Sequence, residues 1–145
     1  MLINILTIVG YMALSGLFGS LIFFSSVVAP LIFIKLETKT AGKFIRSIFP
    51  WYYLSVIILA VLSGLCFAFE YPVKSIIMGL IGCSALYSRQ YLMPRINKQR
   101  DLMLGGDQKA ELAFKWMHRF SVWINGVQLI VVSGILINFL AADLT

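Results

Sequence analysis

Four long stretches without charged residues dominate this 145-residue sequence and limit what it can fold into. They are residues 1–34, 47–69, 75–93 (interrupted only by Arg89) and 120–142. Each is close to or longer than the ~20 residues that an α-helix needs to cross a membrane. The short segments of alternating polarity that are typical of transmembrane β-strands do not occur. We therefore predict an all-α integral membrane four-helix bundle, in which residues 1–145 form a single transmembrane domain.

The composition supports a membrane protein. Hydrophobic residues make up 60% of the chain and charged residues 12%, whereas soluble domains are about 45–50% apolar and roughly 25% charged. The net charge of +6 could suggest nucleic-acid binding, but the positions of the charges favour a membrane topology.

Eleven of the twelve Lys and Arg residues lie in two segments, between the first and second stretches and between the third and fourth. They are Lys35, Lys39, Lys43, Arg46, Arg89, Arg95, Lys98, Arg100, Lys109, Lys115 and Arg119; Lys74 lies elsewhere. The positive-inside rule then places both basic segments in the cytoplasm and the N- and C-termini outside. We expect the bacterial inner (plasma) membrane, with membrane lipids as partners and no nucleic acid.

The first basic segment predicts an amphipathic helix before helix 2. Thr40 is a suitable cap, and Phe44 and Phe49 share one face with Ile45 and Ile48. We expect Pro50 to interrupt this segment and kink it against helix 2, because proline removes a backbone hydrogen bond. The following Trp51-Tyr52-Tyr53 run is typical of an aromatic belt at headgroup depth.

The second basic segment predicts a cytoplasmic helical hairpin between helices 3 and 4. Pro94 should close helix 3, and an amphipathic helix can follow it as far as Leu104. Gly105-Gly106 predicts a turn, and Asp107 can cap the next helix.

The fourth stretch contains a polar stripe. His118, Ser121, Asn125 and Gln128 are three or four residues apart, so a helix places them on one face. Unpaired amides are costly in hydrocarbon, so this face should contact protein or water rather than lipid.

Sorted by the predicted topology, polar and aromatic residues gather in the inner half of the bundle. We predict a binding cluster there of Pro30, Arg46, Pro50, Tyr52, Tyr53, Tyr87, Arg89, His118, Ser121, Asn125 and Gln128. Alternatives remain for its members. Asn125 can simply tie two helices together, His118 can contact headgroups, and Arg89 can extend to the interface.

Catalytic and metal-binding residues are not apparent. The spanning stretches hold no Asp or Glu, and Ser121 and His118 lack a third group that would orient the imidazole. One His and two Cys do not make a zinc or iron–sulfur set. We interpret Cys66 and Cys83 as small buried residues, and we predict no metal, no cofactor and no catalytic residues.

The sequence resembles the transmembrane protein 205-like proteins, a domain family of unknown function with four predicted membrane helices. The resemblance rests on Gly19, Phe23-Phe24, Val28-Ala29-Pro30, Phe33, Ala41-Gly42, Phe49-Pro50, Tyr52-Tyr53, Leu92-Met93-Pro94-Arg95-Ile96-Asn97, Arg100-Asp101, His118, Ser121 and Asn125. It implies the four-helix architecture but no activity. A fainter likeness leads to the copper-resistance D-like proteins and the four-helix type of protoporphyrinogen oxidase. The latter implies haem, which here would need His118 and a second ligand such as a methionine.

Three functions follow as hypotheses. The leading one is a multi-pass, non-enzymatic protein that binds or passes a small amphipathic molecule, lipid or ion in an inner-leaflet polar pocket. A structural or assembly protein is the close rival, since the small-residue pairs Ser15/Gly19 and Gly16/Ser20 can support a homo-oligomer. A haem-dependent membrane oxidoreductase is third.

Overall fold

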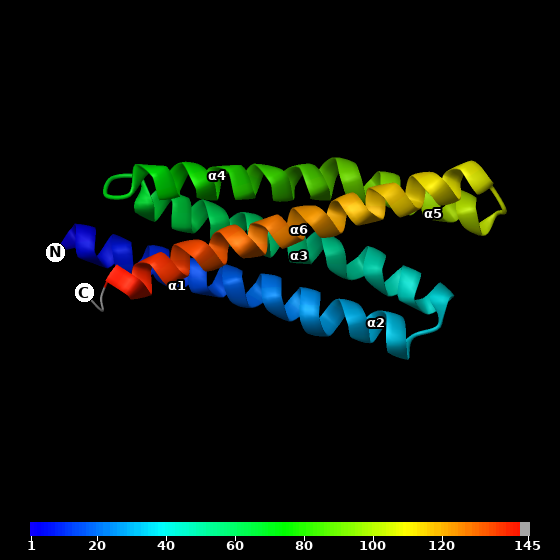
Figure 1. The fold of residues 1–145 in the computed structure, drawn as a ribbon, viewed down its shortest axis with the longest axis horizontal. Coiled ribbons are helices and arrows are strands. Elements are labelled where there is room, and N and C mark those ends of the chain that lie inside the picture. Colours follow the sequence, from blue (N-terminus) through cyan, green and yellow to red (C-terminus); the bar gives the residue numbers. More distant parts are fainter. Residues whose placement is uncertain (143–145) are drawn as a thin grey trace.

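The computed structural model describes residues 1–142, which form four long helical rods (Figure 1). The first rod joins α1 (Leu2–Phe23), the π-helix η1 (Phe24–Val28) and α2 (Ala29–Lys35). The second is α3 (Thr38–Phe67). The third joins α4 (Pro72–Tyr87), the π-helix η2 (Ser88–Leu92) and α5 (Met93–Leu104), and the fourth is α6 (Gln108–Ala142). The described part of the chain is therefore all-helical, as predicted.

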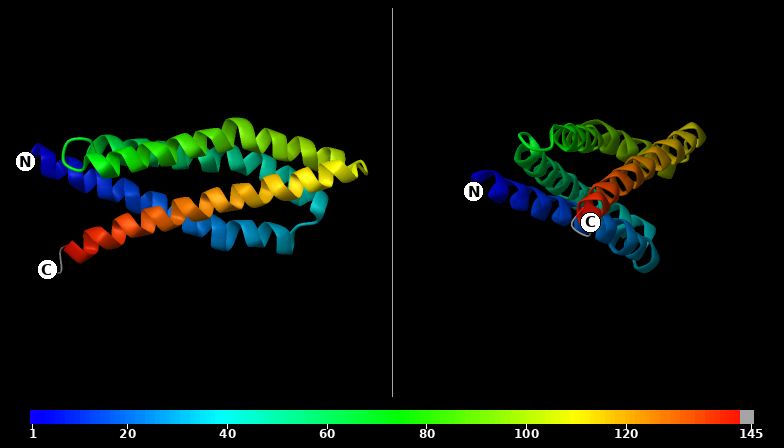
Figure 2. Two further views of the ribbon diagram at one scale, coloured as in Figure 1. Left: turned by 45° about the horizontal axis from the view of Figure 1, so that its top comes forward. Right: turned by 60° about the vertical axis from the view of Figure 1, so that its left-hand side comes forward.

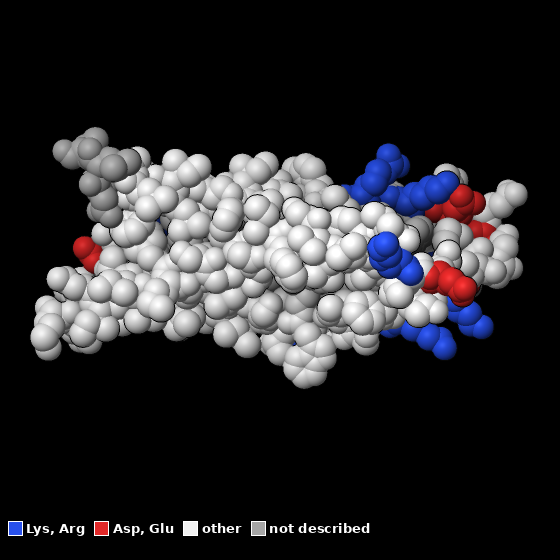
Figure 3. Space-filling model, turned by 90° about the horizontal axis from the view of Figure 1, so that it is seen from below, with Lys and Arg blue, Asp and Glu red and all other residues white. Residues whose placement is uncertain are grey.

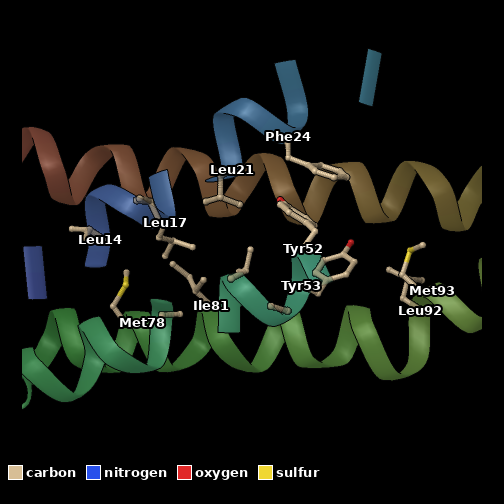
Figure 4. Packing of buried hydrophobic residues seen from close by; sticks show 14 of the residues in the cluster. Leu14, Leu17, Leu21, Phe24, Tyr52, Tyr53, Met78, Ile81, Leu92 and Met93 are labelled. Atoms are coloured by element: carbon tan, nitrogen blue, oxygen red, sulfur yellow. The ribbon is translucent and has the colours of Figure 1, made fainter. Parts of the chain in front are cut away.

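The rods lie side by side and alternate in direction, so the start of α1 and the end of α6 are at the same end of the molecule (Figures 1 and 2). The closest packing is between α3 and α4 and between α1 and α3. The core runs along the centre of α3, where Tyr53, Val56, Ala60 and Phe67 have no exposed surface (Figure 4). At Gly64 an added Cβ would lie 3.2 Å from the Cβ of Met78, so a small residue permits the close approach of α3 and α4.

The turns follow local sequence signals. Gly106 has φ +95°, a conformation that favours glycine, and it lies in the turn between α5 and α6. Asp107 Oδ1 then accepts hydrogen bonds from the backbone N–H groups of Lys109 (2.8 Å) and Ala110 (3.1 Å). The predicted turn and the Asp107 cap are confirmed. Thr40 was the wrong cap, because α3 already begins at Thr38.

The prolines interrupt the rods less than the sequence suggested. Pro50 lies inside the continuous α3, so the amphipathic segment before helix 2 is the first part of that helix and not a separate element. Pro94 does not close the third rod, which continues through η2 into α5. Pro30 and Pro94 each follow a π-helical turn, in which the N–H groups of Ala29 and Met93 bond to carbonyls five residues earlier. Such wide turns let a rod pass a proline without ending.

Three helices are long and apolar enough to cross a membrane: Leu2–Lys35, Thr38–Phe67 and Gln108–Ala141. Among the described residues, the rod that contains the predicted third span does not meet the same criteria. Its α4 part is 16 residues long, and Arg89 and Gln90 follow within η2.

Lys and Arg side chains gather at the end of the molecule that holds the α2–α3 and α5–α6 turns, while the rest of the visible surface is almost free of charge (Figure 3). Burial corrects two other predictions. Cys66 is buried, but Cys83 is exposed. Trp51 is 71% exposed, whereas Tyr52 and Tyr53 are buried in the bundle, so these two tyrosines are not part of a lipid-facing belt.

Candidate functional site

A cavity of about 460 Å³ lies between the first rod and α6, toward the basic end of the molecule. Its lining comes from η1 and α2 (Phe24, Ser25, Ala29, Ile32, Phe33), α3 (Thr38, Ile45, Phe49), α5 (Met93, Ile96, Asn97, Arg100, Met103) and α6 (Phe114, His118, Ser121, Val122, Asn125, Gly126, Leu129). The volume is within the range of pockets that hold small molecules, roughly 300–1,000 Å³.

The cavity is long and mostly apolar. Its α6 wall extends from Phe114 to Leu129, which at 1.5 Å per residue is about 22 Å along the helix. The lining residues that are exposed at the surface include Phe33 of α2 and Val122 of α6. Exposed lining residues also include Ser25, Thr38 and His118, so the part of the lining that reaches the surface carries both apolar and polar side chains.

Asn125 is hydrogen-bonded to α3. Its Oδ1 accepts from the Tyr52 hydroxyl (2.8 Å), and its Nδ2 donates to the Ser121 carbonyl (3.0 Å) and more distantly to the Tyr53 hydroxyl (3.4 Å). The hydroxyls of Tyr53 and Ser121 are also 3.4 Å apart. The Asn125 side chain thus points into the bundle toward the second rod, as the sequence predicted. The carboxamide joins two helices and also forms part of the cavity wall.

Aromatic rings hold this polar group in place. The Phe24 ring stacks on Tyr52 with 3.9 Å between centroids (Figure 4). Phe49 meets Phe24 edge-on, with 5.0 Å between centroids. Because Phe24 belongs to η1, the π-helical turn places one of the cavity's lining side chains against the Tyr52 ring.

Arg100 supplies a buried charge at the other end of the cavity. Its side chain comes from α5 and the residue is only 9% exposed. Nη2 donates to the backbone carbonyl of Thr38 (2.7 Å). Within residues 1–142, no carboxylate lies within 4.0 Å of this guanidinium. A Cβ added at Gly42 would lie 2.5 Å from Nη1, so glycine at this position makes room for the guanidinium.

The structure brings some residues of the predicted inner cluster together around the cavity and places others elsewhere. His118, Ser121 and Asn125 line the cavity. Tyr52 bonds to Asn125, and Tyr53 is within hydrogen-bond distance of Ser121 and Asn125. Gln128 is 3% exposed but faces α4 instead, where Nε2 donates to Ser84 Oγ (2.8 Å).

The remaining predicted residues do not line the cavity. Arg46 pairs with Asp101 on the surface and approaches the Asn97 carbonyl (3.4 Å). Arg89 does not simply extend to the interface, because Nε donates to the Pro50 carbonyl (3.2 Å). Tyr87 is exposed and stacks on Tyr91 at 6.0 Å, and Pro30 is exposed at the start of α2.

The predicted site did not include Arg100, Asn97, Thr38 or Gly42. Arg100 in particular resembled the other basic residues of the second cytoplasmic segment. A signal was present in the spacing. Met93, Ile96 and Arg100 are three and four residues apart, so a continuous helix carries Arg100 on the buried face of α5. Ile96 and Arg100 were already on one predicted amphipathic helix, but ending helix 3 at Pro94 separated Met93 from them.

Metal binding has no obvious site in the described part of the chain. Within residues 1–142, no three His, Cys, Asp or Glu side chains are grouped to hold a metal ion.

The fold and the cavity define an all-helical protein with apolar rods of membrane-spanning length. The chain belongs to the family described as Domain of unknown function (DUF4149), whose sequence profile matches residues 12–103. This match includes the cavity walls from η1, α2, α3 and α5, but not the wall from α6. The more specific resemblance to transmembrane protein 205-like proteins stays a prediction. No curated protein and no solved structure matches the chain.

Proposed function

We propose that this protein is a multi-pass membrane protein whose cavity binds a small amphipathic molecule. In this proposal the third rod also crosses the membrane, so the protein has four spans. The α2–α3 and α5–α6 turns are in the cytoplasm of a bacterium. Both termini then lie outside, which agrees with the start of α1 and the end of α6 being at one end of the bundle.

The observation that carries the proposal is the polarity of the cavity. Apolar side chains such as Phe24, Ile32 and Leu129 form most of its wall, while Arg100 and Asn97 lie toward the basic end. Exposed apolar lining residues, Phe33 on α2 and Val122 on α6, would let a lipid-soluble molecule enter between these helices. A pocket with this arrangement suits a molecule that has an apolar body and a polar head.

A structural or assembly role is the second candidate, and one observation favours it. Asn125 has hydrogen-bond partners on α3 and on its own helix, so it does not need a ligand. A homo-oligomer formed through small-residue faces belongs to this proposal. Gly19 is exposed and meets nothing within 4 Å.

We do not propose haem chemistry. The sequence has one histidine, His118, which is exposed and stacks on Phe114 of the same helix at 5.8 Å. The cavity lining contains no second histidine, and although Met93 and Met103 of α5 line it, no contact joins either of them to His118 among the described residues.

Gly126 gives a direct test of the binding proposal. This residue lines the cavity, and a Cβ added to it meets nothing within 4 Å. Gly126→Leu should therefore fill part of the cavity without disturbing the packing. Gly134→Leu is the matched control, because Gly134 is two turns further along α6, is equally unobstructed, and does not line the cavity.

The measurement is photolabelling of the purified protein in lipid nanodiscs with a monoacylglycerol that carries a diazirine in its chain. Labelled residues are located by mass spectrometry. We expect labelling of the cavity wall between Phe114 and Leu129 in the wild type and in Gly134→Leu, and much less in Gly126→Leu. Equal labelling of all three proteins would contradict binding in this cavity and favour the structural role.

A further inference from the structure

We propose that the cavity selects amphiphiles with an anionic head, a carboxylate or a phosphate ester, and that Arg100 binds this head. The inference rests on the proposed binding function and names the class of ligand. The observation behind it is a buried guanidinium that has no carboxylate partner among the described residues and that lines a mostly apolar cavity.

The charge balance around Arg100 is the first argument. A buried cation is normally paired with a carboxylate or otherwise neutralised, because removing an unpaired charge from water is costly. Here the neighbouring Asp101 pairs with Arg46 on the surface, and Arg100 bonds to the neutral Thr38 carbonyl. An anion that entered the cavity would supply the missing charge.

The geometry of the guanidinium is the second argument. Arginine presents several N–H groups in one plane, and this arrangement matches two oxygens of a carboxylate or phosphate. The side chain bonds to Thr38 through Nη2, and the structure gives no protein partner for Nη1 among the described residues. The guanidinium packs against Gly42, where an added Cβ would lie 2.5 Å from Nη1, so any larger residue at this position would displace it. The group is therefore fixed in position while part of its donor capacity stays available.

The length of the cavity is the third argument. Arg100 is four residues from the end of α5, the helix that leads into the α5–α6 turn at the basic end of the molecule. From there the α6 wall continues for about 22 Å and becomes apolar toward Leu129. Two of the three polar side chains along this wall, Asn125 and Ser121, already have partners on α3. The third, His118, is stacked on Phe114 of the same helix. An acyl chain, rather than a second charged group, suits this part of the cavity.

The test compares three photoreactive probes that share one diazirine acyl chain and differ in the head. They are a fatty acid, a lysophosphatidic acid and the uncharged monoacylglycerol. The protein is the full chain in nanodiscs of zwitterionic lipid, and the readout is the dependence of cavity labelling on probe concentration. We expect Arg100→Gln to raise the concentration of both anionic probes that gives half-maximal labelling by about tenfold or more. This is the size of effect expected for loss of a charge-assisted hydrogen bond. Labelling by the monoacylglycerol should stay the same.

Three further variants keep the test decisive. Gly42→Ala keeps the charge but displaces the guanidinium, so it should weaken the anionic probes selectively even if Arg100→Gln fails to fold. Arg100→Lys keeps the charge but lacks the planar guanidinium. Its half-maximal concentration for the anionic probes should lie between those of the wild type and Arg100→Gln. Arg95→Gln is the matched control and should change nothing, because Arg95 is exposed on α5 and lies over the Tyr91 ring at 5.4 Å.

The outcomes separate this inference from the proposed function. If Gly126→Leu does not reduce labelling by any probe, the binding cavity itself is refuted. If Gly126→Leu reduces all three but Arg100→Gln and Gly42→Ala do not discriminate between heads, only the role of Arg100 is refuted. Competition by millimolar inorganic phosphate as effective as that by the fatty acid would show a site for free anions and overturn the acyl-chain part of the inference.

Discussion

Asn125→Leu should destabilise the bundle through the tyrosine that it leaves without a partner. The substitution removes the acceptor of the 2.8 Å hydrogen bond from Tyr52, whose ring is buried against Phe24. Hydrogen bonds between membrane helices contribute about 0.6–2 kcal/mol, and a buried hydroxyl left unpaired costs about 1–3 kcal/mol. We therefore expect a loss of about 1–3 kcal/mol in the free energy of unfolding.

A double-mutant cycle with Tyr52→Phe isolates this interaction. Removing both partners leaves no unpaired group, so the double variant should recover much of the stability that Asn125→Leu loses. The coupling energy should be about 0.6–1.7 kcal/mol. The measurement is equilibrium unfolding in lipid bicelles by steric trapping.

Asn138→Leu is the matched control for this cycle. Asn138 is an exposed carboxamide on the same helix, and its replacement should change the free energy of unfolding by no more than about 0.5 kcal/mol. The reasoning fails if Asn125→Leu is as stable as the wild type, or if the effects of Asn125→Leu and Tyr52→Phe simply add.

Three further predictions concern topology, packing and surface charge. A reporter active only in the cytoplasm should give signal when fused after Gly106 and none after Thr145, and the reverse would overturn the proposed orientation. Gly10→Ala should lower the free energy of unfolding by a net ~1–2 kcal/mol in the same assay. The added Cβ would lie 2.7 Å from the buried Phe67 ring, and this clash should outweigh the higher helix propensity of alanine. Gly19→Ala, which meets nothing within 4 Å, should not lower stability, and equal losses for the two variants would contradict the packing argument. Arg46→Gln should lower stability by less than about 1 kcal/mol, since its pair with Asp101 is exposed, and a larger loss would mean that the pair supports the fold.

Local sequence patterns predicted much of the secondary structure. The uncharged stretches became the rods, the Gly106 turn and the Asp107 cap formed where expected, and Asn125 faces the bundle. These features depend on helix periodicity and backbone preference over a few residues. The effect of the prolines was predicted wrongly at Pro50 and Pro94, because helix continuity depends on neighbouring turns, including the π-helical turn before Pro94.

The sequence by itself determined which residues share a helix face, since a period of 3.6 residues follows from the backbone alone. Only the tertiary structure decided what each face meets. Gln128 and Asn125 belong to one polar stripe, yet the rods direct one to α4 and the other to α3. Arg100 is one of eleven similar charges in the sequence, and it is buried because α3 brings Gly42 and the Thr38 carbonyl against it. Such burial is a property of segments about sixty residues apart, which no local pattern contains.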